Sequence, residues 1–205
     1  MNEIKAIIFD MGGVIIRTCD RNPRQELANR LGITISELEN KVFYSDSSFR
    51  SERGEITKQE HWKNVLHNIN IKNVNIKEID EAFWAGDCLN SELVEFIRKL
   101  KKNYRIGLLS NAFLNACEWL DKKFHFINEF DLSVFSYEVE MRKPDSRIYL
   151  LICNRLKANP SSAVFIDDFF ANVQGARNAG LQAIQYKENN QIRNDLNALL
   201  QKENK

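Results

Sequence analysis

Five short stretches of this chain are rich in apolar and β-branched residues, and each is bounded by residues typical of turns or helix ends. We expect them to be strands, at residues 5–10, 105–110, 132–135, 163–167 and 182–186. In residues 6–9 and 164–166 no polar residue alternates with the apolar ones, which is typical of strands buried on both faces. Helix-length apolar patterns alternate with the strands from the second one onward, so the sequence predicts an α/β fold built on a parallel sheet.

The connection after the first strand is far longer than a strand-to-helix connection needs. Between residues 17 and 104 we expect helices and no strand. The helix signals there are Pro23 with Gly32, Ser36 three residues before Glu39, Thr57 three residues before Glu60, and a helical pattern at residues 76–86. We therefore predict an all-helical domain at residues 17–90, joined by two connections to a core domain of residues 1–16 and 91–205, in the manner of a hinged lid.

Composition and charge exclude several classes of protein. Lys and Arg number 29 against 28 Asp and Glu, and a net charge of +1 creates no field that would attract nucleic acid. The longest apolar runs are too short to span a bilayer, and the N-terminus lacks the apolar segment of a signal peptide. We expect a cytoplasmic protein, monomeric or homodimeric, that binds neither nucleic acid nor membranes.

Neither the cysteines nor the histidines have the spacing of a metal site. The cysteines are far apart, without a C-x-x-C pair, and we expect free thiols, mostly buried, at Cys19, Cys88, Cys117 and Cys153. The histidines share no metal-ligand spacing, and we expect surface or helix-face positions for His61, His67 and His125.

Polar side chains follow several of the predicted strands at the point where each strand ends. They are Asp10, Ser110, Asn111, Lys143, Asp167 and Asp168. Parallel sheets bind ligands at the carboxyl ends of their strands, so these groups are expected to share one crevice. Three carboxylates there would repel one another without a cation, and an all-oxygen set suits Mg²⁺. A phosphate, Mg²⁺ and a lysine would balance the charge.

The same inventory suggests a reaction. With no Ser-His or Cys-His arrangement evident, the candidate nucleophile is a carboxylate, and its attack on phosphorus would give an aspartyl-phosphate that water can cleave. Phosphoryl transfer needs in-line positioning and charge neutralisation, which Mg²⁺, a lysine and fixed donors supply.

Four sequence motifs, in order, resemble those of the haloacid dehalogenase superfamily, in the subfamily with a helical cap inserted after the first strand. The motifs are residues 9–14 (FDMGGV), 108–111 (LLSN), 141–144 (MRKP) and 165–172 (FIDDFFAN). Residues 52–57 (ERGEIT) also resemble a common cap sequence of that subfamily. The resemblance covers nearly the whole chain and implies a Rossmann-like core with an inserted all-helical cap.

The resemblance also implies roles for individual residues. Asp10 would be the nucleophile and a metal ligand, Asp168 a second metal ligand, and Gly12 would offer its backbone carbonyl to Mg²⁺. Asp167 would be an acid behind these ligands, and Asn172 would take the place of a further acid in the fourth motif.

The phosphoryl group would be held by a second set of residues. Ser110 and Asn111, with the backbone at Gly12, would bind the phosphoryl oxygens, and Lys143 would pair with both the nucleophile and the phosphate. Ser110 and Lys143 would therefore act in catalysis beside Asp10.

One position departs from the pattern of the superfamily. Most of its phosphatases carry a second Asp two residues after the nucleophile as general acid and base, and this chain has Gly12 there. The departure is similar to that in bacterial phosphatases acting on α-D-glucose 1-phosphate, whose anomeric leaving group needs little protonation. The charged cap residues Arg17, Asp20, Glu52 and Arg53 are candidates to replace the acid, although charged helix residues are mostly solvated.

The leading hypothesis is a Mg²⁺-dependent phosphomonoesterase for a small phosphorylated metabolite, with a sugar 1-phosphate as one candidate. Two alternatives stay open. One is a 2-haloacid dehalogenase, which needs no metal, and the other is a weakly catalytic protein that binds a phosphorylated ligand or partner.

Overall fold

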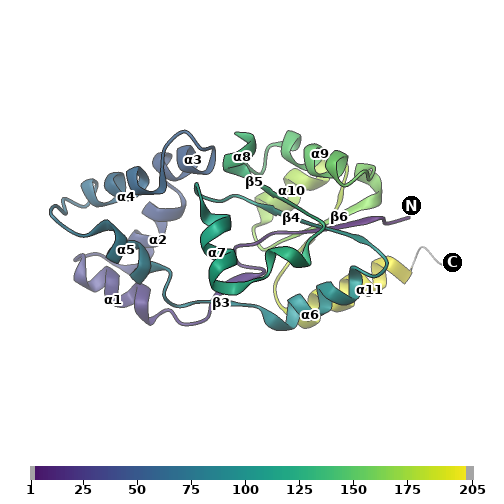
Figure 1. Cartoon of the computed structure of the whole chain (residues 1–205), viewed down its shortest axis with the longest axis horizontal. Helices are drawn as coiled ribbons and strands as arrows, with labels where there is room; N and C mark the ends of the chain where they lie inside the picture. The colour runs from purple at the N-terminus through teal and green to yellow at the C-terminus, as the bar shows by residue number, and fades with distance from the viewer. Residues whose placement is uncertain (1–2, 202–205) are drawn as a thin grey trace.

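The computed structural model describes residues 3–201 and places a five-stranded parallel sheet at the centre of one lobe (Figure 1). The strand order is β5-β4-β1-β6-β7. The bounds are β1 Ala6–Phe9, β4 Arg105–Ser110, β5 Leu132–Phe135, β6 Ala163–Asp167 and β7 Gln182–Gln185. All five predicted strands are present, and only the first and last are shorter than expected. The α/β prediction is confirmed.

Helices cover both faces of this sheet, as the apolar runs of the strands require. On one face Ile7 and Phe9 pack with α6 (Ser91–Leu100), α7 (Ala116–Phe124) and α11 (Asn189–Gln201). On the other face Ala6 and Ile8 pack with α9 (Ser146–Arg155) and α10 (Phe170–Asn178). β1 lies between β4 and β6, so strands are added on one side of β1 as far as β5 and then on its other side from β6 onward. Open parallel sheets bind ligands at such a switch point. Short helical turns complete this lobe at η1 (Ile127–Glu129), α8 (Ser136–Val139) and η2 (Pro160–Ser162).

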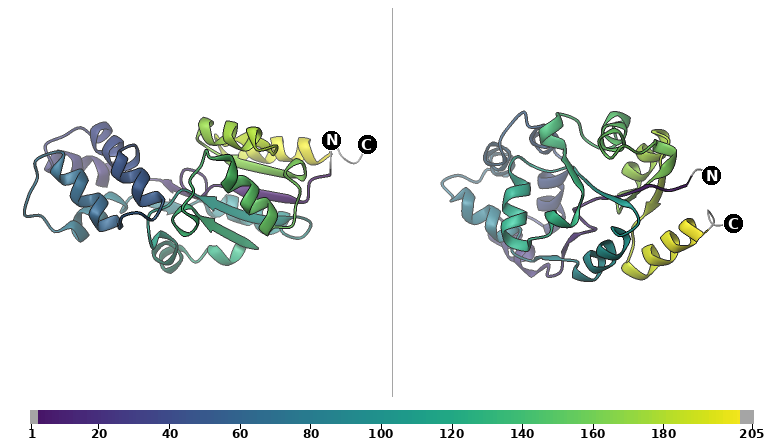
Figure 2. Two further views of the ribbon diagram at one scale, coloured as in Figure 1. Left: turned by 90° about the horizontal axis from the view of Figure 1, so that it is seen from above. Right: turned by 45° about the vertical axis from the view of Figure 1, so that its right-hand side comes forward.

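A second, all-helical lobe stands beside the sheet (Figures 1 and 2). Its helices are α1 (Asn22–Arg30), α2 (Ile35–Phe43), α3 (Asp46–Glu52), α4 (Lys58–His67) and α5 (Ile76–Phe83). They enclose a separate apolar core that includes Leu38, Trp62 and Phe83, and Phe113 joins it from the sheet lobe. We refer to this lobe as the cap. No helix among the described residues is both long enough and apolar enough to cross a membrane.

Two short strands that the sequence analysis missed connect the cap to the sheet lobe. β2 (Ile16–Thr18) and β3 (Asp87–Leu89) pair antiparallel, with Arg17 opposite Cys88. The expectation that residues 17–104 hold no strand is therefore wrong. Three-residue strands of mixed polarity carry no periodic signal, and these form because the two connections run side by side.

The free-thiol prediction is wrong for two of the four cysteines. Cys19 and Cys88 form a disulfide, with Cα atoms 5.8 Å apart and 69 residues between them in sequence, and it links the two connections between cap and core. Cys117 and Cys153 are free, as expected. A separation of this length gives no pairing signal, because the pairing depends on the fold bringing the two connections together.

Helix α2 starts two residues earlier than its predicted capping signal. The Thr34 hydroxyl accepts a hydrogen bond from the Glu37 backbone N–H at 3.2 Å, and a Glu37 carboxylate oxygen accepts one from the Thr34 N–H at 2.8 Å. Ser36 lies inside the helix, and its predicted partner Glu39 instead pairs with Arg21 and Arg24. The predicted capping box at Thr57 and Glu60 is confirmed.

His61 lies on α4, as the expectation of a surface or helix-face position allows, but it is fully buried in the cap, whereas His67 and His125 are exposed. The Nδ1 of His61 lies 2.9 Å from the Ser47 hydroxyl, and its ring packs 5.0 Å from the ring of Phe113. Burial disfavours the charged imidazolium and lowers the pKa of His61 to about 4.

We predict that Thr34→Ala lowers the free energy of unfolding by about 1 kcal/mol, because the Glu37 backbone N–H loses its acceptor and the Glu37 carboxylate loses a hydroxyl donor. The matched control Ser36→Ala is expected to stay within about 0.5 kcal/mol of the wild type, since Ser36 is an exposed interior helix position. Urea unfolding of both variants measures the difference. Equal losses in the two variants would contradict the assignment of Thr34 as the cap.

We also predict that His61 makes stability depend on pH. Its folded pKa lies below its unfolded value, so the unfolded chain binds the extra proton, and the stability present above pH 6.5 is lost as the pH falls toward 4. The free energy of unfolding should fall by about 2 kcal/mol more between pH 7 and pH 5 in the wild type than in His61→Gln. Parallel slopes for the two proteins would refute this role, and His67→Gln serves as the exposed control.

Candidate active site

The predicted site residues meet at the carboxyl edge of the sheet. Asp10 directly follows β1, Ser110 ends β4, and Asp167 ends β6. The Asp10 backbone N–H donates to the carbonyl of Ile166 at 2.8 Å, which fixes the end of β1 against β6. A cavity of about 610 Å³ opens here and is lined by Asp10 and Lys143 from the sheet lobe together with cap residues.

The buried ammonium group of Lys143 connects these segments. Its Nζ lies 2.6 Å from Asp10 Oδ1, 2.7 Å from Asp167 Oδ2 and 3.1 Å from the carbonyl oxygen of Leu109. The side chain is 1% exposed, so three protein acceptors replace water around the charge. The Asn111 side chain holds the Lys143 backbone on both sides, accepting from its N–H at 2.8 Å and donating to its carbonyl at 3.0 Å.

The charges in this cluster shift the pKa values of its members. Burial and the negative charge of Asp167 raise the pKa of Asp10 well above its usual value, and the Lys143 ammonium only partly offsets them. Burial alone would lower the pKa of Lys143, but the charges of Asp10 and Asp167 outweigh it and raise that pKa. The ammonium therefore stays charged, and the carboxyl groups of the cluster outnumber it.

Asp167 is completely buried and acts as a fixed acceptor behind the cavity. Its carboxylate accepts from Lys143, from the Phe169 backbone N–H at 2.8 Å, and from the Asn172 amide at 3.0 and 3.1 Å. These donors occupy both of its oxygens. Asp167 therefore lies behind the cavity wall and Asn172 reaches the wall itself, and their predicted roles stay predictions.

Asp168 lies on the open side of the cluster, directly over Gly13. A Cβ on Gly13 would lie 2.1 Å from Asp168 Oδ2, and Gly13 has a φ of +79°, so only glycine fits at this position. The Asp168 side chain is open to the cavity, but the surrounding protein and the Asp167 charge raise its pKa to about 6. The sequence analysis gave Gly13 no role, although its place in the first motif was a usable signal.

The residues fit a magnesium ion. Asp10, Asp167 and Asp168 each offer an oxygen within 4.8 Å of the others, and three carboxyls face a single lysine. Hard oxygen donors with excess negative charge are the surroundings that Mg²⁺ prefers. Burial first and the charge of Asp167 second raise the pKa values of Asp10 and Asp168, and a cation would stabilise both groups as carboxylates.

Gly12, Ser110 and Asn111 lie at the same edge, and their predicted roles toward phosphate stay predictions. Gly12 is exposed in the cavity wall, and a Cβ there would meet no atom within 4 Å. The buried Ser110 hydroxyl donates to the Asn111 carbonyl at 3.2 Å. The Asn111 amide is occupied by the Lys143 backbone, so in this structure it positions the lysine.

Two of the four charged cap candidates, Arg17 and Glu52, line the cavity, and Asp20 and Arg53 do not. The Glu52 carboxylate accepts from Arg142 Nε at 2.7 Å, and burial raises the pKa of Glu52 against the opposing charge of Arg142. Arg142 also lines the cavity. The sequence analysis included it in the third motif without giving it a role.

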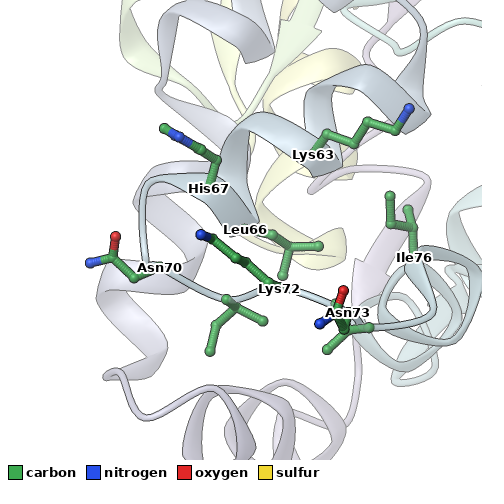
Figure 3. A pocket seen from close by; sticks show the side chains of 9 residues that line it. Lys63, Leu66, His67, Asn70, Lys72, Asn73 and Ile76 are labelled. Atoms are coloured by element: carbon green, nitrogen blue, oxygen red, sulfur yellow. The ribbon is translucent and has the colours of Figure 1, made fainter.

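A smaller cavity of about 260 Å³ lies within the cap between the end of α4 and the start of α5 (Figure 3). Its lining includes Lys63, His67 and Lys72 and contains no carboxylate. It therefore lacks the groups of the predicted chemistry, which gather at the sheet edge.

Comparison with known proteins agrees with this geometry. The chain is 25% identical over 206 residues to a D-ribitol-5-phosphate phosphatase of Bacteroides thetaiotaomicron, covering 96% of this chain and 98% of the relative. It is 39% identical over 94 residues to a phosphorylated carbohydrates phosphatase of Thermotoga maritima, covering 45% of this chain and 42% of the relative.

A crystal structure of an HAD family enzyme from Bacteroides thetaiotaomicron, in complex with magnesium and inorganic phosphate, superposes with a TM-score of 0.75. The two sequences are 27% identical, and the match covers 90% of this chain and 94% of the other. The family model for haloacid dehalogenase-like hydrolases matches residues 4–180. With the fold and the four ordered motifs in place, we conclude that the chain belongs to the haloacid dehalogenase-like hydrolase family.

Proposed function

We propose that this protein is a Mg²⁺-dependent phosphatase that hydrolyses a small phosphorylated carbohydrate through an aspartyl-phosphate on Asp10. The observation that carries the proposal is the buried Lys143 ammonium shared by Asp10 and Asp167, with Asp168 open to the cavity beside them. The named activities of the two relatives, on ribitol 5-phosphate and on phosphorylated carbohydrates, support the substrate class.

The orientation of the Asp10 carboxylate supports its role as nucleophile. Its Oδ1 accepts from the Met11 backbone N–H at 2.7 Å and pairs with Lys143 at 2.6 Å. No described residue donates to Oδ2, so this oxygen is available to attack phosphorus. Two fixed donors on one oxygen hold the carboxylate in a single orientation, which in-line displacement requires.

Asp10, Asp168 and the backbone carbonyl of Gly12 would hold Mg²⁺, which when bound neutralises the charge of the phosphoryl oxygens. The Lys143 ammonium, whose three donors go to Asp10, Asp167 and the Leu109 carbonyl, would stabilise the remaining phosphoryl charge through its own positive charge. Ser110 would donate its hydroxyl to a phosphoryl oxygen by turning away from the Asn111 carbonyl. Water would then cleave the acyl-phosphate bond and free Asp10 for another cycle.

Protonation of the leaving group is the step for which this chain lacks the usual residue. The superfamily resemblance places an acid where Gly12 stands, and a missing proton donor costs roughly 10²- to 10⁴-fold in rate. A leaving group with a low pKa, such as the anomeric oxygen of a sugar 1-phosphate, depends least on that proton. Gly12 is therefore an argument for a sugar 1-phosphate as the substrate of this chain. The name of the relative that acts on ribitol 5-phosphate is an argument for the phosphate of a primary alcohol.

The cap supports this function by closing the cavity from the side opposite the sheet. We propose residues 17–90 as the cap domain and residues 1–16 and 91–205 as the core domain, the terminal residues 1, 2 and 202–205 lying outside the described part of the chain. The cytoplasmic location, the monomeric or homodimeric state and the absence of nucleic-acid binding stay predictions from the sequence.

We predict that phosphate release from sugar phosphates needs Mg²⁺ and falls roughly 10³-fold or more in Asp10→Asn, because the amide cannot form the acyl-phosphate. EDTA should abolish turnover and added Mg²⁺ should restore it. The matched control Asp145→Asn, at the partly exposed N-cap of α9 outside the cavity lining, should keep full activity.

Three outcomes would contradict the proposal. Metal-independent release of halide from 2-haloacids would identify a dehalogenase. Mg²⁺-dependent phosphate binding without turnover on any phosphate ester would identify a binding protein. Full activity in a folded Asp10→Asn variant would exclude Asp10 as nucleophile.

We further predict that Gly12→Asp folds normally and raises kcat by roughly 10- to 100-fold on alkyl phosphates, because it restores a proton donor. The site has room for it, since a Cβ at this position meets no atom within 4 Å. Turnover of p-nitrophenyl phosphate, whose leaving group needs no proton, should change little. The neighbouring Gly13→Ala should inactivate the enzyme, because its methyl group would collide with the Asp168 carboxylate.

The ratio of the two rates decides this prediction. If Gly12→Asp changes kcat equally on alkyl and p-nitrophenyl phosphates, proton donation to the leaving group does not limit the wild-type rate. Another group would then already supply the proton.

A further inference from the structure

The cap and the sheet lobe touch directly beside the site, between α3 and α8 (Figure 1). Gly54 follows α3 with a φ of +74°, and a Cβ there would lie 2.8 Å from the carbonyl oxygen of Tyr137 in α8. Glycine at this position therefore allows the cap backbone to approach the core backbone closely. Arg142, three residues beyond the end of α8, reaches back across the same contact.

The guanidinium of Arg142 is held by two residues of α3. Its Nε donates to Glu52 Oε2 at 2.7 Å, and its central carbon lies 4.3 Å from the centre of the Phe49 ring. The ion pair is largely shielded, with the two side chains 26% and 11% exposed. A planar cation fixed by a carboxylate on one edge and an aromatic face beneath it keeps one orientation.

The contacts with Glu52 and Phe49 leave the terminal N–H groups of the guanidinium without a hydrogen-bond acceptor in the described part of the chain. The two terminal nitrogens of Arg142 have no hydrogen-bond acceptor among residues 3–201, and the side chain lines the same cavity as Asp10 and Lys143. Because Lys143 is the next residue, Arg142 projects from the segment that carries the phosphate-binding lysine. Its free donors are thus available to the part of a substrate that adjoins the phosphoryl group.

The charge of the cap wall indicates which chemistry those donors would meet. Three cations of the cavity lining are paired with carboxylates. Arg24 pairs with Asp87 and Glu39, Lys58 pairs with Asp80, and Arg142 pairs with Glu52. Arg17 is the one lining cation within the described chain that has no carboxylate partner, and its Nη1 instead donates weakly to the Tyr186 hydroxyl at 3.5 Å. A wall with mostly compensated charge suits a neutral body with hydroxyl groups better than a second phosphate.

Aromatic rings complete this wall. Trp84 and Trp119 line the cavity with Phe43 and Phe49, and the apolar faces of such rings pack well against the C–H groups of a carbohydrate. Hydroxyl groups of the same molecule then require fixed donors and acceptors, which the Arg142–Glu52 pair offers.

We propose that Arg142 determines substrate specificity by donating its terminal N–H groups to hydroxyl oxygens of the carbohydrate adjoining the phosphate, and that Glu52 and Phe49 are its positioning residues. This inference rests on the proposed phosphatase function and specifies how the cap and core together select the substrate. The cap supplies the orientation of the guanidinium and the core supplies its side chain, so recognition requires both lobes.

The experiment compares substrates with and without hydroxyl groups. The probes are D-ribitol 5-phosphate, α-D-glucose 1-phosphate and n-pentyl phosphate, assayed for phosphate release with Mg²⁺. In Arg142→Met, kcat/KM on whichever hydroxylated probe the wild type prefers should fall roughly 10- to 100-fold, through KM, because charged hydrogen bonds to the substrate are lost. The value on n-pentyl phosphate should change less than about threefold.

Further variants separate recognition from structure. Arg142→Lys keeps the positive charge but lacks the two terminal nitrogens of the planar guanidinium. Its kcat/KM on the hydroxylated probe should fall roughly 5- to 10-fold. Glu52→Gln should raise KM on that probe while leaving kcat unchanged. Arg53→Met is the matched control, because Arg53 lies beside Glu52 and pairs with Glu55 outside the cavity, and it should behave as the wild type.

The outcomes distinguish the two levels of the proposal. Equal losses on hydroxylated and hydroxyl-free probes would mean that Arg142 only docks the cap, and unchanged values on all probes would mean that it does not contact substrate. Either result overturns the specificity role while the phosphatase stands. A wild type that releases phosphate from no probe would overturn the proposed function itself, and the specificity role with it.

Discussion

The buried ammonium group of Lys143 is the interaction on which the site depends. It draws Asp10 from the end of β1 and Asp167 from the end of β6 to within 2.7 Å of one nitrogen, inside a protein environment that excludes water. A charge at this depth persists only when it is paired and hydrogen-bonded, and the Leu109 carbonyl supplies the third acceptor. Loss of the lysine would leave two carboxyl groups buried against each other.

The same cluster leaves the site short of positive charge. Three carboxyl groups lie close together with one ammonium among them, and burial together with the charge of Asp167 raises the pKa values of Asp10 and Asp168. A divalent cation would cancel the two negative charges that three carboxylates and one ammonium leave, and the same cation would attract a phosphate dianion. The site is thus electrostatically prepared for the pair of ligands that phosphoryl transfer needs.

The cap adds a second apolar core beside the first, and the cavity lies where the two meet. The two lobes are joined by the β2–β3 pair with the Cys19–Cys88 disulfide, by the α3–α8 contact, and by Phe113, which packs into the cap core. The charged cluster therefore lies at the edge of the sheet, whereas much of the facing cavity wall comes from the cap. Membership of the family accounts for the charged cluster at the sheet edge. The cavity wall formed by the cap depends on the individual side chains of this chain.

The sequence by itself determined the sheet, the inserted helices and the strand-end residues of the site. Apolar runs such as residues 6–9 can only be buried on both faces, and residues at the ends of parallel strands must share one edge, so Asp10 and Asp167 were predictable from local pattern. Tertiary structure alone decided the pairing of Cys19 with Cys88, the burial of His61 and the grip of Glu52 on Arg142. Each of these joins residues whose closeness comes from how the cap packs on itself or on the core, and local sequence carries no signal for a contact that depends on that packing.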